Sequence, residues 1–377
     1  MNVQGGRDAA FMRIAIREAK KGLGRTSPNP VVGAVVVKDG KIVGKGYHHK
    51  AGTPHAEVHA LHAAGSLAAG SCLYVTLEPC NHTGRTPPCT RAILQSGIAR
   101  VVVGMADPNP GVAGNGADFL KKQGVSVVIG VLEEQCRKMN LPFIKHCSSG
   151  LPWVILKAAL SIDGKLATGT GHSAWITGEQ ARAAVHRLRN RVDAILIGSG
   201  TAAADDPSLT TRLTGRAGRD PLRVIIDSEL KMKPTAKMLR QASKASTWIF
   251  CAADAINEKA AKELAAAGAV IKKVGRQKDD RLALSEVLAE LGRCQINSVL
   301  VEGGGRIHSS LLSDALADEA YFFHAPILLG NDGIAVVDGL GLTSVRDAIR
   351  LCDIEYRRYG DDMLLHGYFR QTDAKRG

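Results

Sequence analysis

The sequence predicts an α/β protein built from two domains. Its 377 residues correspond to two domains at the usual length of about 150 residues each. In both halves, short apolar runs alternate with segments of helical periodicity, which is typical of a sheet with helices on both faces. A polar stretch containing glycine and proline at 145–152 separates the halves and indicates a domain joint. We expect one domain over 1–147 and another over 151–373.

Four strands and four helices are predicted in the first half. Each strand is a short apolar run, and each helix has apolar residues three or four positions apart. The strands are expected at 31–37, 73–77, 101–104 and 125–131, and the helices at 10–21, 55–64, 89–96 and 117–123. This alternation predicts a sheet between two helical layers.

The second half repeats the alternation with more strands. They are expected at 153–158, 194–197, 223–226, 247–251, 269–274, 298–301, 321–324 and 363–369. Helical periodicity is found at 178–191, 255–267, 282–291 and 306–312. This half is therefore also predicted to be an α/β domain.

Composition excludes several classes of protein. Hydrophobic residues make up 45% and charged residues 23%, so a disordered, collagen-like or coiled-coil chain is excluded. The apolar runs are far shorter than the ~20 residues that span a bilayer, and the first residues lack the apolar segment of a signal peptide. We expect a cytoplasmic protein without a membrane partner. There, its eight cysteines would serve metal binding or catalysis more often than disulfides.

The positive charge is uneven. The net charge is +13, and residues 1–150 carry 18 basic against 9 acidic side chains, leaving only +4 for the remainder. Such charge attracts anions, but it does not distinguish nucleic acid from a phosphorylated substrate, a dinucleotide or a merely solvated face. The 4% aromatic content weighs against single-strand nucleic-acid binding, which uses aromatic faces for stacking.

The strongest chemical pattern in the first half is His55-Ala56-Glu57, followed by Cys80 and Cys89. Imidazole and thiolate are zinc ligands, and three protein ligands leave the fourth position open for water, as in catalytic zinc sites. Zinc lowers the pKa of bound water from about 16 to about 7. Glu57 is then a candidate to carry protons.

Other interpretations of these residues remain open. His59 and His62 follow His55 at helical spacing, so a different metal-binding face of one helix is conceivable. Spacing alone does not tell whether Glu57 faces the metal, because two residues along an ideal helix turn a side chain away. The remaining cysteines have no paired spacing and are interpreted as small buried side chains; they are Cys72, Cys136, Cys147, Cys251, Cys294 and Cys352.

Three segments together resemble the deaminase domain of the bifunctional riboflavin-biosynthesis deaminase/reductase family. They are 29–36 (Asn-Pro-Val-Val-Gly-Ala-Val-Val), 76–89 around the two cysteines, and 107–110 (Asp-Pro-Asn-Pro). The resemblance implies a cytidine-deaminase-like α/β/α domain with Zn²⁺ on His55, Cys80 and Cys89, and with Glu57 as the catalytic proton shuttle. Zinc nucleobase deaminases have this His-x-Glu…Pro-Cys…Cys order, usually with two residues between the cysteines. Here there are eight, and Asn81 stands where the family usually has serine.

Two glycine-containing turns follow predicted strands in the second half, at 198–200 and 303–305. Glycines at a strand-to-helix turn let backbone N–H groups approach a phosphate. Neither turn has the full dinucleotide fingerprint, so for each turn taken alone an ordinary tight turn is the better interpretation.

Four further segments resemble the reductase domain of the same family, which is similar in fold to dihydrofolate reductase. They are 161–165, 173–177, 201–207 and 302–304, and the likeness to the whole family spans roughly 7–370, with pattern more than motif between 216 and 295. The resemblance implies NADPH contacts at Ala159, Trp175, Thr201, Asp205, Ser228, Gly303, Gly304 and Gly305. It implies substrate contacts at Ser173, Arg189, Leu209, Arg212 and Glu302.

The residue types suit these roles. Arg189 and Arg212 can each offer a bidentate fork to a phosphate, and Glu302 can accept hydrogen bonds. Trp175 can present an apolar face with one N–H donor. Alternatives remain, because Arg189 lies among three arginines at 187–191 that are plausibly solvated, and Trp175 suits a core position equally.

The resemblance implies two reactions. A zinc-dependent hydrolysis would deaminate 2,5-diamino-6-(5-phosphoribosylamino)pyrimidin-4(3H)-one. An NADPH-dependent reduction would then give 5-amino-6-(5-phosphoribitylamino)uracil. The expected partner is a small phosphorylated pyrimidine and not nucleic acid, with self-association through the reductase domain. Two other hypotheses are a base deaminase acting on RNA such as tRNA, and a non-catalytic zinc and nucleotide sensor.

Overall fold

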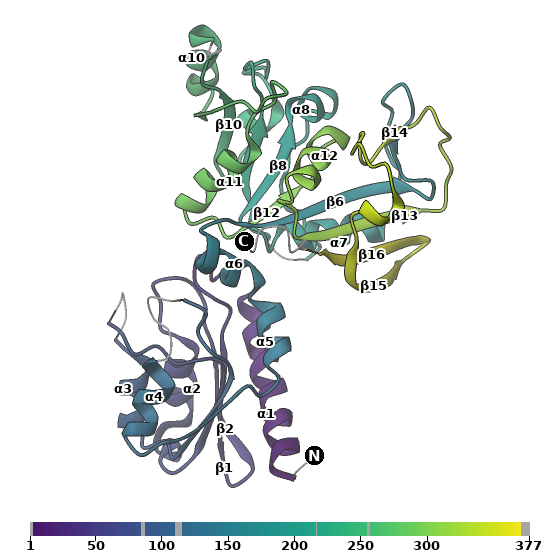
Figure 1. Cartoon of the computed structure of the whole chain (residues 1–377). Coiled ribbons are helices and arrows are strands. Elements are labelled where there is room, and N and C mark those ends of the chain that lie inside the picture. Colours follow the sequence, from purple (N-terminus) through teal and green to yellow (C-terminus); the bar gives the residue numbers. More distant parts are fainter. Residues whose placement is uncertain (1–2, 84–86, 110–114, 216, 255–256, 371–377) are drawn as a thin grey trace. The chain divides into compact units, whose positions relative to one another are not determined.

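The computed structural model of the chain divides into two compact units, Met1–Gly150 and Leu151–Gly377 (Figure 1). It describes residues 3–83, 87–109, 115–215, 217–254 and 257–370. Four features of the sequence analysis lie outside these residues. They are 84–86 of the cysteine spacer, Pro110, the start of the helix expected from 255, and the domain end expected at 373.

The N-terminal unit is a five-stranded sheet with the order β2-β1-β3-β4-β5. Its strands are β1 (Gly33–Lys38), β2 (Lys41–Tyr47), β3 (Cys72–Leu77), β4 (Arg100–Met105) and β5 (Ser126–Ile129). Strand β1 pairs antiparallel with β2 and β3, whereas β3, β4 and β5 are parallel. The helices are α1 (Val3–Ala19), α2 (Ala56–Ala64), α3 (Cys89–Gln95), α4 (Asn115–Lys122), α5 (Glu133–Met139) and α6 (Leu141–Ser149).

Two glycines show how closely helices cover both faces of this sheet. A β-carbon at Gly33 would lie 2.1 Å from the backbone oxygen of Ala15 on α1, and one at Gly46 would lie 2.5 Å from that of Ala56 on α2. Because Gly46 pairs with Ala34, the neighbour of Gly33, the two glycines face opposite sides of the pleated sheet. Helices α1 and α2 therefore pack on opposite faces (Figure 1), and the first turn of α2 lies directly against β2.

The C-terminal unit is built on a nine-stranded mixed sheet with the order β11-β10-β9-β8-β12-β6-β13-β16-β15. Neighbours are parallel from β11 to β13, and β16 and β15 add antiparallel pairs. The strands are β6 (Trp153–Ser161), β8 (Ala194–Gly198), β9 (Leu222–Ile226), β10 (Thr247–Ala252), β11 (Ala269–Val274), β12 (Ser298–Val301), β13 (Glu319–Ala325), β15 (Leu351–Tyr359) and β16 (Asp362–Phe369).

Helices and short elements complete this unit. The helices are α7 (Glu179–Arg189), α8 (Ser199–Asp205), α9 (Lys237–Arg240), α10 (Glu258–Ala266), α11 (Leu284–Arg293) and α12 (Gly305–Ser313). A separate two-stranded ribbon pairs β7 (Lys165–Ala167) with β14 (Ile334–Ala335). Along β8, Ala194 and Leu196 enter one core and Ile195 and Ile197 the other. Burial on both faces explains the continuous apolar runs of the central strands.

These elements confirm the predicted two-domain α/β class. All the predicted strands and helices are present, with α1 beginning earlier than expected, at Val3. The division between the two units follows Gly150, inside the stretch 145–152 where a joint is expected. The first part of this stretch is helical, because α6 continues to Ser149 and ends at Gly150 in the left-handed conformation.

In the C-terminal unit, β8, β9 and β12 are parallel neighbours, so their carboxyl ends lie at the same end of the sheet. In parallel α/β sheets, ligands bind beyond the carboxyl ends of the strands. Here these ends lead into three segments named in the sequence analysis: α8 after β8, Ser228 after β9, and Glu302–Gly305 after β12.

Candidate functional site

Three residues of the N-terminal unit form a compact ligand cluster. The Nδ1 atom of His55 lies 3.3 Å from Sγ of Cys89 and 3.6 Å from Sγ of Cys80, and all three ligand atoms lie within 4.8 Å of one another. Zinc bonds of about 2.3 Å to sulfur and 2.0 Å to nitrogen at a tetrahedral angle imply a nitrogen–sulfur separation of about 3.5 Å. The cluster therefore fits one zinc ion with three protein ligands.

Each ligand stands where an element begins or ends. His55 has an extended backbone and precedes the first residue of α2, Cys80 follows β3, and Cys89 opens α3. The backbone N–H of Cys89 donates to Sγ of Cys80 at 3.4 Å. Across the same turn, the Thr90 hydroxyl donates to Oδ1 of Asn81 at 2.7 Å. The residue that departs from the family pattern, Asn81, thus helps to hold the cysteine turn together.

The environment of the Cys80 sulfur favours thiolate. A hydrogen bond from the Cys89 side chain, reinforced by His55, lowers the pKa of Cys80 to about 4 against the effect of burial. Because Cys89 donates that hydrogen bond and is itself buried, its own pKa is raised. Thiolate is the form of cysteine that binds metal.

Glu57 lies in the first turn of α2 with only 3% of its surface exposed. Burial raises its pKa to about 7, and its carboxyl group interacts with His55 and with the Cys89 side chain. The helical-wheel objection to Glu57 does not hold, because His55 precedes the helix and takes its direction from an extended backbone. A buried carboxyl group beside the ligands is placed to accept and return a proton.

Sequence reasoning assigned no role to His48, which stands beside the cluster. Its ring lies edge-on to that of His55 with 5.2 Å between centroids. Its Nδ1 is 3.2 Å from the carbonyl of Pro54, and its Nε2 is 3.0 Å from Nδ2 of Asn29. Since a carbonyl only accepts, Nδ1 carries the proton and Nε2 accepts from the amide. Burial lowers the pKa of His48, so a neutral imidazole forms this wall.

The alternative helical metal face is absent from the part of the chain that the structure describes. Among those residues, His55, Cys80 and Cys89 are the one group of three ligands close enough to share an ion. His59 instead stacks on His49 with 4.3 Å between ring centroids.

A cavity of 1020 Å³ in the C-terminal unit is lined by all thirteen residues that the resemblance assigned to NADPH and substrate. They are Ala159, Ser173, Trp175, Arg189, Thr201, Asp205, Leu209, Arg212, Ser228, Glu302, Gly303, Gly304 and Gly305. Small-molecule sites commonly measure about 300–1,000 Å³, so this volume suits a cofactor and a substrate together.

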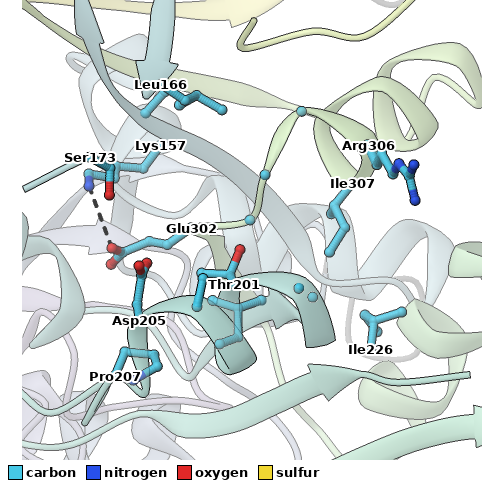
Figure 2. Close-up of a pocket in the computed structure, with 18 of the residues that line it drawn as sticks. Lys157, Leu166, Ser173, Thr201, Asp205, Pro207, Ile226, Glu302, Arg306 and Ile307 are labelled. Atoms are coloured by element: carbon cyan, nitrogen blue, oxygen red, sulfur yellow. Dashed lines mark ion pairs between the residues drawn. The ribbon is translucent and has the colours of Figure 1, made fainter. Parts of the chain in front are cut away.

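Charged side chains meet on one side of the cavity (Figure 2). Arg189 donates from Nε and Nη2 to the two carboxylate oxygens of Glu302 at 2.7 and 2.9 Å. Lys157 on β6, which sequence reasoning missed, places Nζ 3.5 Å from the same carboxylate. Burial alone would raise the pKa of Glu302, but Arg189 and Lys157 lower it to about 2. Glu302 is therefore a carboxylate at any working pH.

Helix α7 also supports the segment that carries Arg212. The Nη1 atom of Arg189 donates to the carbonyl of Thr210 at 3.2 Å, and the backbone N–H of Arg212 donates to Nδ1 of His186 at 3.3 Å. Burial, together with Arg189 and Arg212, lowers the pKa of His186 to about 4, which keeps it a neutral acceptor. Of the three arginines that the sequence left open, Arg189 lies in the cavity, whereas Arg187 is exposed.

Trp175 is not a core residue. It is 76% exposed, and the guanidinium of Arg182 lies 4.5 Å from its ring centre. Helix α8 presents Thr201 and Asp205 to the same cavity (Figure 2). Burial raises the pKa of Asp205. An exposed indole that lines a cavity offers an apolar face to a ligand.

Comparisons with known proteins agree with both sites. Residues 6–105 match the cytidine and deoxycytidylate deaminase zinc-binding region, and residues 152–365 match the RibD C-terminal domain. The riboflavin biosynthesis protein RibD of Bacillus amyloliquefaciens is 46% identical over 356 residues, which cover 94% of each chain. RibD of Escherichia coli is 40% identical over 370 residues, covering 95% of this chain and 98% of that protein.

Solved structures give the same result. An Acinetobacter baumannii RibD structure has a TM-score of 0.87 at 37% identity, covering 97% of this chain and 100% of that one. A deaminase/reductase from Thermotoga maritima has a TM-score of 0.83 at 37% identity with the same coverage. No helix among the described residues is long and apolar enough to cross a membrane.

The fold and its two sites define a zinc-binding deaminase domain joined to a reductase domain. The chain belongs to the RibD family of bifunctional riboflavin-biosynthesis deaminase/reductases. The family predicted from the sequence is thereby confirmed.

Proposed function

We propose that the chain catalyses two consecutive reactions, with deamination over 1–147 and reduction over 151–373. The first releases ammonia from 2,5-diamino-6-(5-phosphoribosylamino)pyrimidin-4(3H)-one, and the second reduces the ribosyl group to give 5-amino-6-(5-phosphoribitylamino)uracil. A similar solved protein from Thermotoga maritima carries the corresponding deaminase and reductase names. The observation that carries the proposal is Glu57, buried beside three ligands that leave a fourth zinc position open.

Deamination replaces the amino group on a ring carbon by oxygen from water. Zinc held by His55, Cys80 and Cys89 would supply an activated water. Glu57 can carry the two protons of that water, one to the neighbouring ring nitrogen and one to the departing amine, so that ammonia leaves and a carbonyl remains on the ring. The neutral imidazole of His48, held by its contacts with Pro54 and Asn29, borders the site without adding a charge to it.

The proposal of NADPH is supported by the cavity of the second unit. The turn Gly303–Gly305 leads into α12, whose first residue is Gly305, and the first N–H groups of a helix suit a diphosphate. Thr201 faces this turn, with its Oγ1 3.9 Å from where a β-carbon of Gly304 would lie. When bound, NADPH supplies the hydride that joins C1′ of the ribosyl group.

Reduction also needs a proton and a fixed substrate. The substrate opens its sugar ring when a proton moves from the exocyclic nitrogen to the ring oxygen, and a proton returns to nitrogen as C1′ is reduced. Glu302 accepts hydrogen bonds from the substrate, and Lys157 is the ammonium beside it that can deliver the proton. Arg189 holds Glu302, and the exposed Arg212 extends toward the phosphate in this proposal.

The proposal is tested by incubating the purified chain with the diaminopyrimidine phosphate, with and without NADPH. We expect ammonia in both reactions and NADPH oxidation that follows ammonia release. Oxidation of NADPH without ammonia release would contradict the proposed order. A gel shift with tRNA tests the RNA-acting alternative, which requires tight and salt-sensitive binding. Self-association through the reductase unit stays a prediction for sedimentation measurements.

Replacing Arg212 by alanine is expected to weaken binding of the phosphorylated substrate to the reductase. Loss of the charge-assisted, bidentate hydrogen bonds from Arg212 to the phosphate should raise KM by about tenfold or more while kcat changes little. Zinc content should not change. Steady-state reductase assays on wild-type and Arg212→Ala protein measure this, with exposed Arg187→Ala on the neighbouring helix as control. An unchanged KM would exclude Arg212 from the phosphate site.

A further inference from the structure

One end of the reductase cavity contains residues that the proposed function leaves unused. We call it the distal end and define it by Ile226, Arg281, Leu282, Arg306, Ile307 and Ser310, all of which line the cavity. Figure 2 shows Glu302 and Lys157 on one side, Arg306, Ile307 and Ile226 on the other, and Thr201 between them. The cavity is therefore charged at the substrate side and mixed apolar and basic at the distal end.

Two arginines from different elements meet at the distal end. Arg306 and Ser310 are four residues apart on α12, so they lie on the same side of that helix. Arg281 reaches this side from the loop between β11 and α11, where its Nη1 donates to Oγ of Ser310 at 3.2 Å. Within the described residues, Arg306 has no ion-pair partner.

Arg281 has an acidic partner in Asp279. Its carboxylate lies 3.2 Å from Nε of Arg281, and both side chains are 51% exposed. The other carboxylate of the loop, Asp280, pairs with Arg276 instead. The guanidinium of Arg281 is thus paired with a carboxylate, whereas that of Arg306 has no ion-pair partner among the described residues and offers its positive charge on the Ser310 side of α12.

The proposed function fixes which half of a dinucleotide reaches this place. Hydride transfer requires the nicotinamide beside the substrate, hence near Glu302. The diphosphate then lies at the turn Gly303–Gly305, between the two sides of the cavity. The adenosine half must continue past α12 to the distal end, where Ile226, Leu282 and Ile307 provide apolar surface for the base.

We propose that Arg281 and Arg306, with the hydroxyl of Ser310, bind the 2′-phosphate of NADPH and so select NADPH over NADH. This inference rests on the proposed reductase function. A phosphomonoester carries a charge of about −1.5 to −2 at neutral pH, and arginine forks match its geometry. NADH has only a hydroxyl at this position and gains nothing from the two guanidinium groups.

The test compares wild-type protein with Arg281→Ser, Arg306→Ser and the double variant. The control is Arg293→Ser, which removes an exposed arginine of α11 outside the cavity. For the double variant we expect kcat/KM to fall by about tenfold or more with NADPH and to change less than about twofold with NADH. A proportional loss with both cofactors, or an unchanged ratio, would overturn the inference.

Binding of two nucleotide fragments separates this inference from the proposed function. Titrations with 2′,5′-ADP and with 5′-ADP probe the distal end without hydride transfer. We expect wild-type protein to bind 2′,5′-ADP more tightly than 5′-ADP, and the double variant to lose that difference. Equal binding of the two fragments to wild type overturns the arginine assignment even if reductase activity is present. Reductase inactivity with both cofactors, together with an intact fragment preference, contradicts the proposed function alone.

Discussion

Glu57→Ala protein is expected to release no measurable ammonia while reducing the already deaminated substrate at the wild-type rate. A positioned general acid–base group contributes about 100- to 10,000-fold to a rate, and the buried carboxyl group of Glu57 interacts with both His55 and Cys89. Ammonia release and NADPH oxidation, measured separately on the two substrates, check both parts of this result.

The matched control is Glu18→Gln, which changes another buried carboxylate of the same unit, on α1, where it pairs with Lys21. It should leave ammonia release intact. If Glu57→Ala protein lost both activities while keeping its fold and zinc, the assignment of the two reactions to separate units would be wrong. If it kept ammonia release, Glu57 would not be the proton carrier.

Glu302→Gln protein is expected to lose reductase activity and to retain ammonia release, which is the opposite of the result expected for Glu57→Ala. Glutamine keeps the size of the side chain but removes the charge that pairs with Arg189 and Lys157. Loss of a buried charge-assisted interaction with substrate, together with disturbance of Lys157, should lower reductase kcat/KM by about 100-fold or more. NADPH oxidation on the deaminated substrate measures the effect.

A second buried carboxylate in the same unit serves as control. Glu319 on β13 pairs with His366 at 2.6 Å and accepts from Nε1 of Trp153 at 2.7 Å, and it does not line the cavity. Glu319→Gln should reduce stability in a thermal melt without a comparable loss of kcat/KM. Equal activity losses in both variants would mean that Glu302 acts only through the stability of the fold.

The sequence predicted the central strands well because their apolar runs are buried on both faces. It missed β2 and β15, which lie at one edge of each large sheet, although it predicted β5 and β11 at the opposite edges. Strand β2 contains two glycines and two lysines and is half-exposed, and β15 is mostly exposed. Edge strands need no continuous apolar run, so their periodicity is weak. The short helices α5 and α6 were also missed; α5 consists mostly of charged and polar residues, and α6 contains a proline in its first turn.

Short-range motifs predicted which residues the structure brings together at the ligand cluster. What they left out depends on distant parts of the chain. Lys157 is one residue in an apolar strand, and its partner Glu302 follows another strand far along the sequence. His48 likewise acquires its place only when Asn29 and Pro54 fix its ring. Contacts of this kind depend on strand order, which local patterns do not contain.

Elemental analysis of the purified chain beside its Cys80→Ser variant tests the central claim most directly. The cluster of His55, Cys80 and Cys89 predicts about one zinc per wild-type chain, with zinc and ammonia release lost together in the variant and NADPH oxidation on the deaminated substrate retained. Wild-type protein that releases ammonia while holding no zinc, or a Cys80→Ser variant that keeps its full zinc content, would contradict the account.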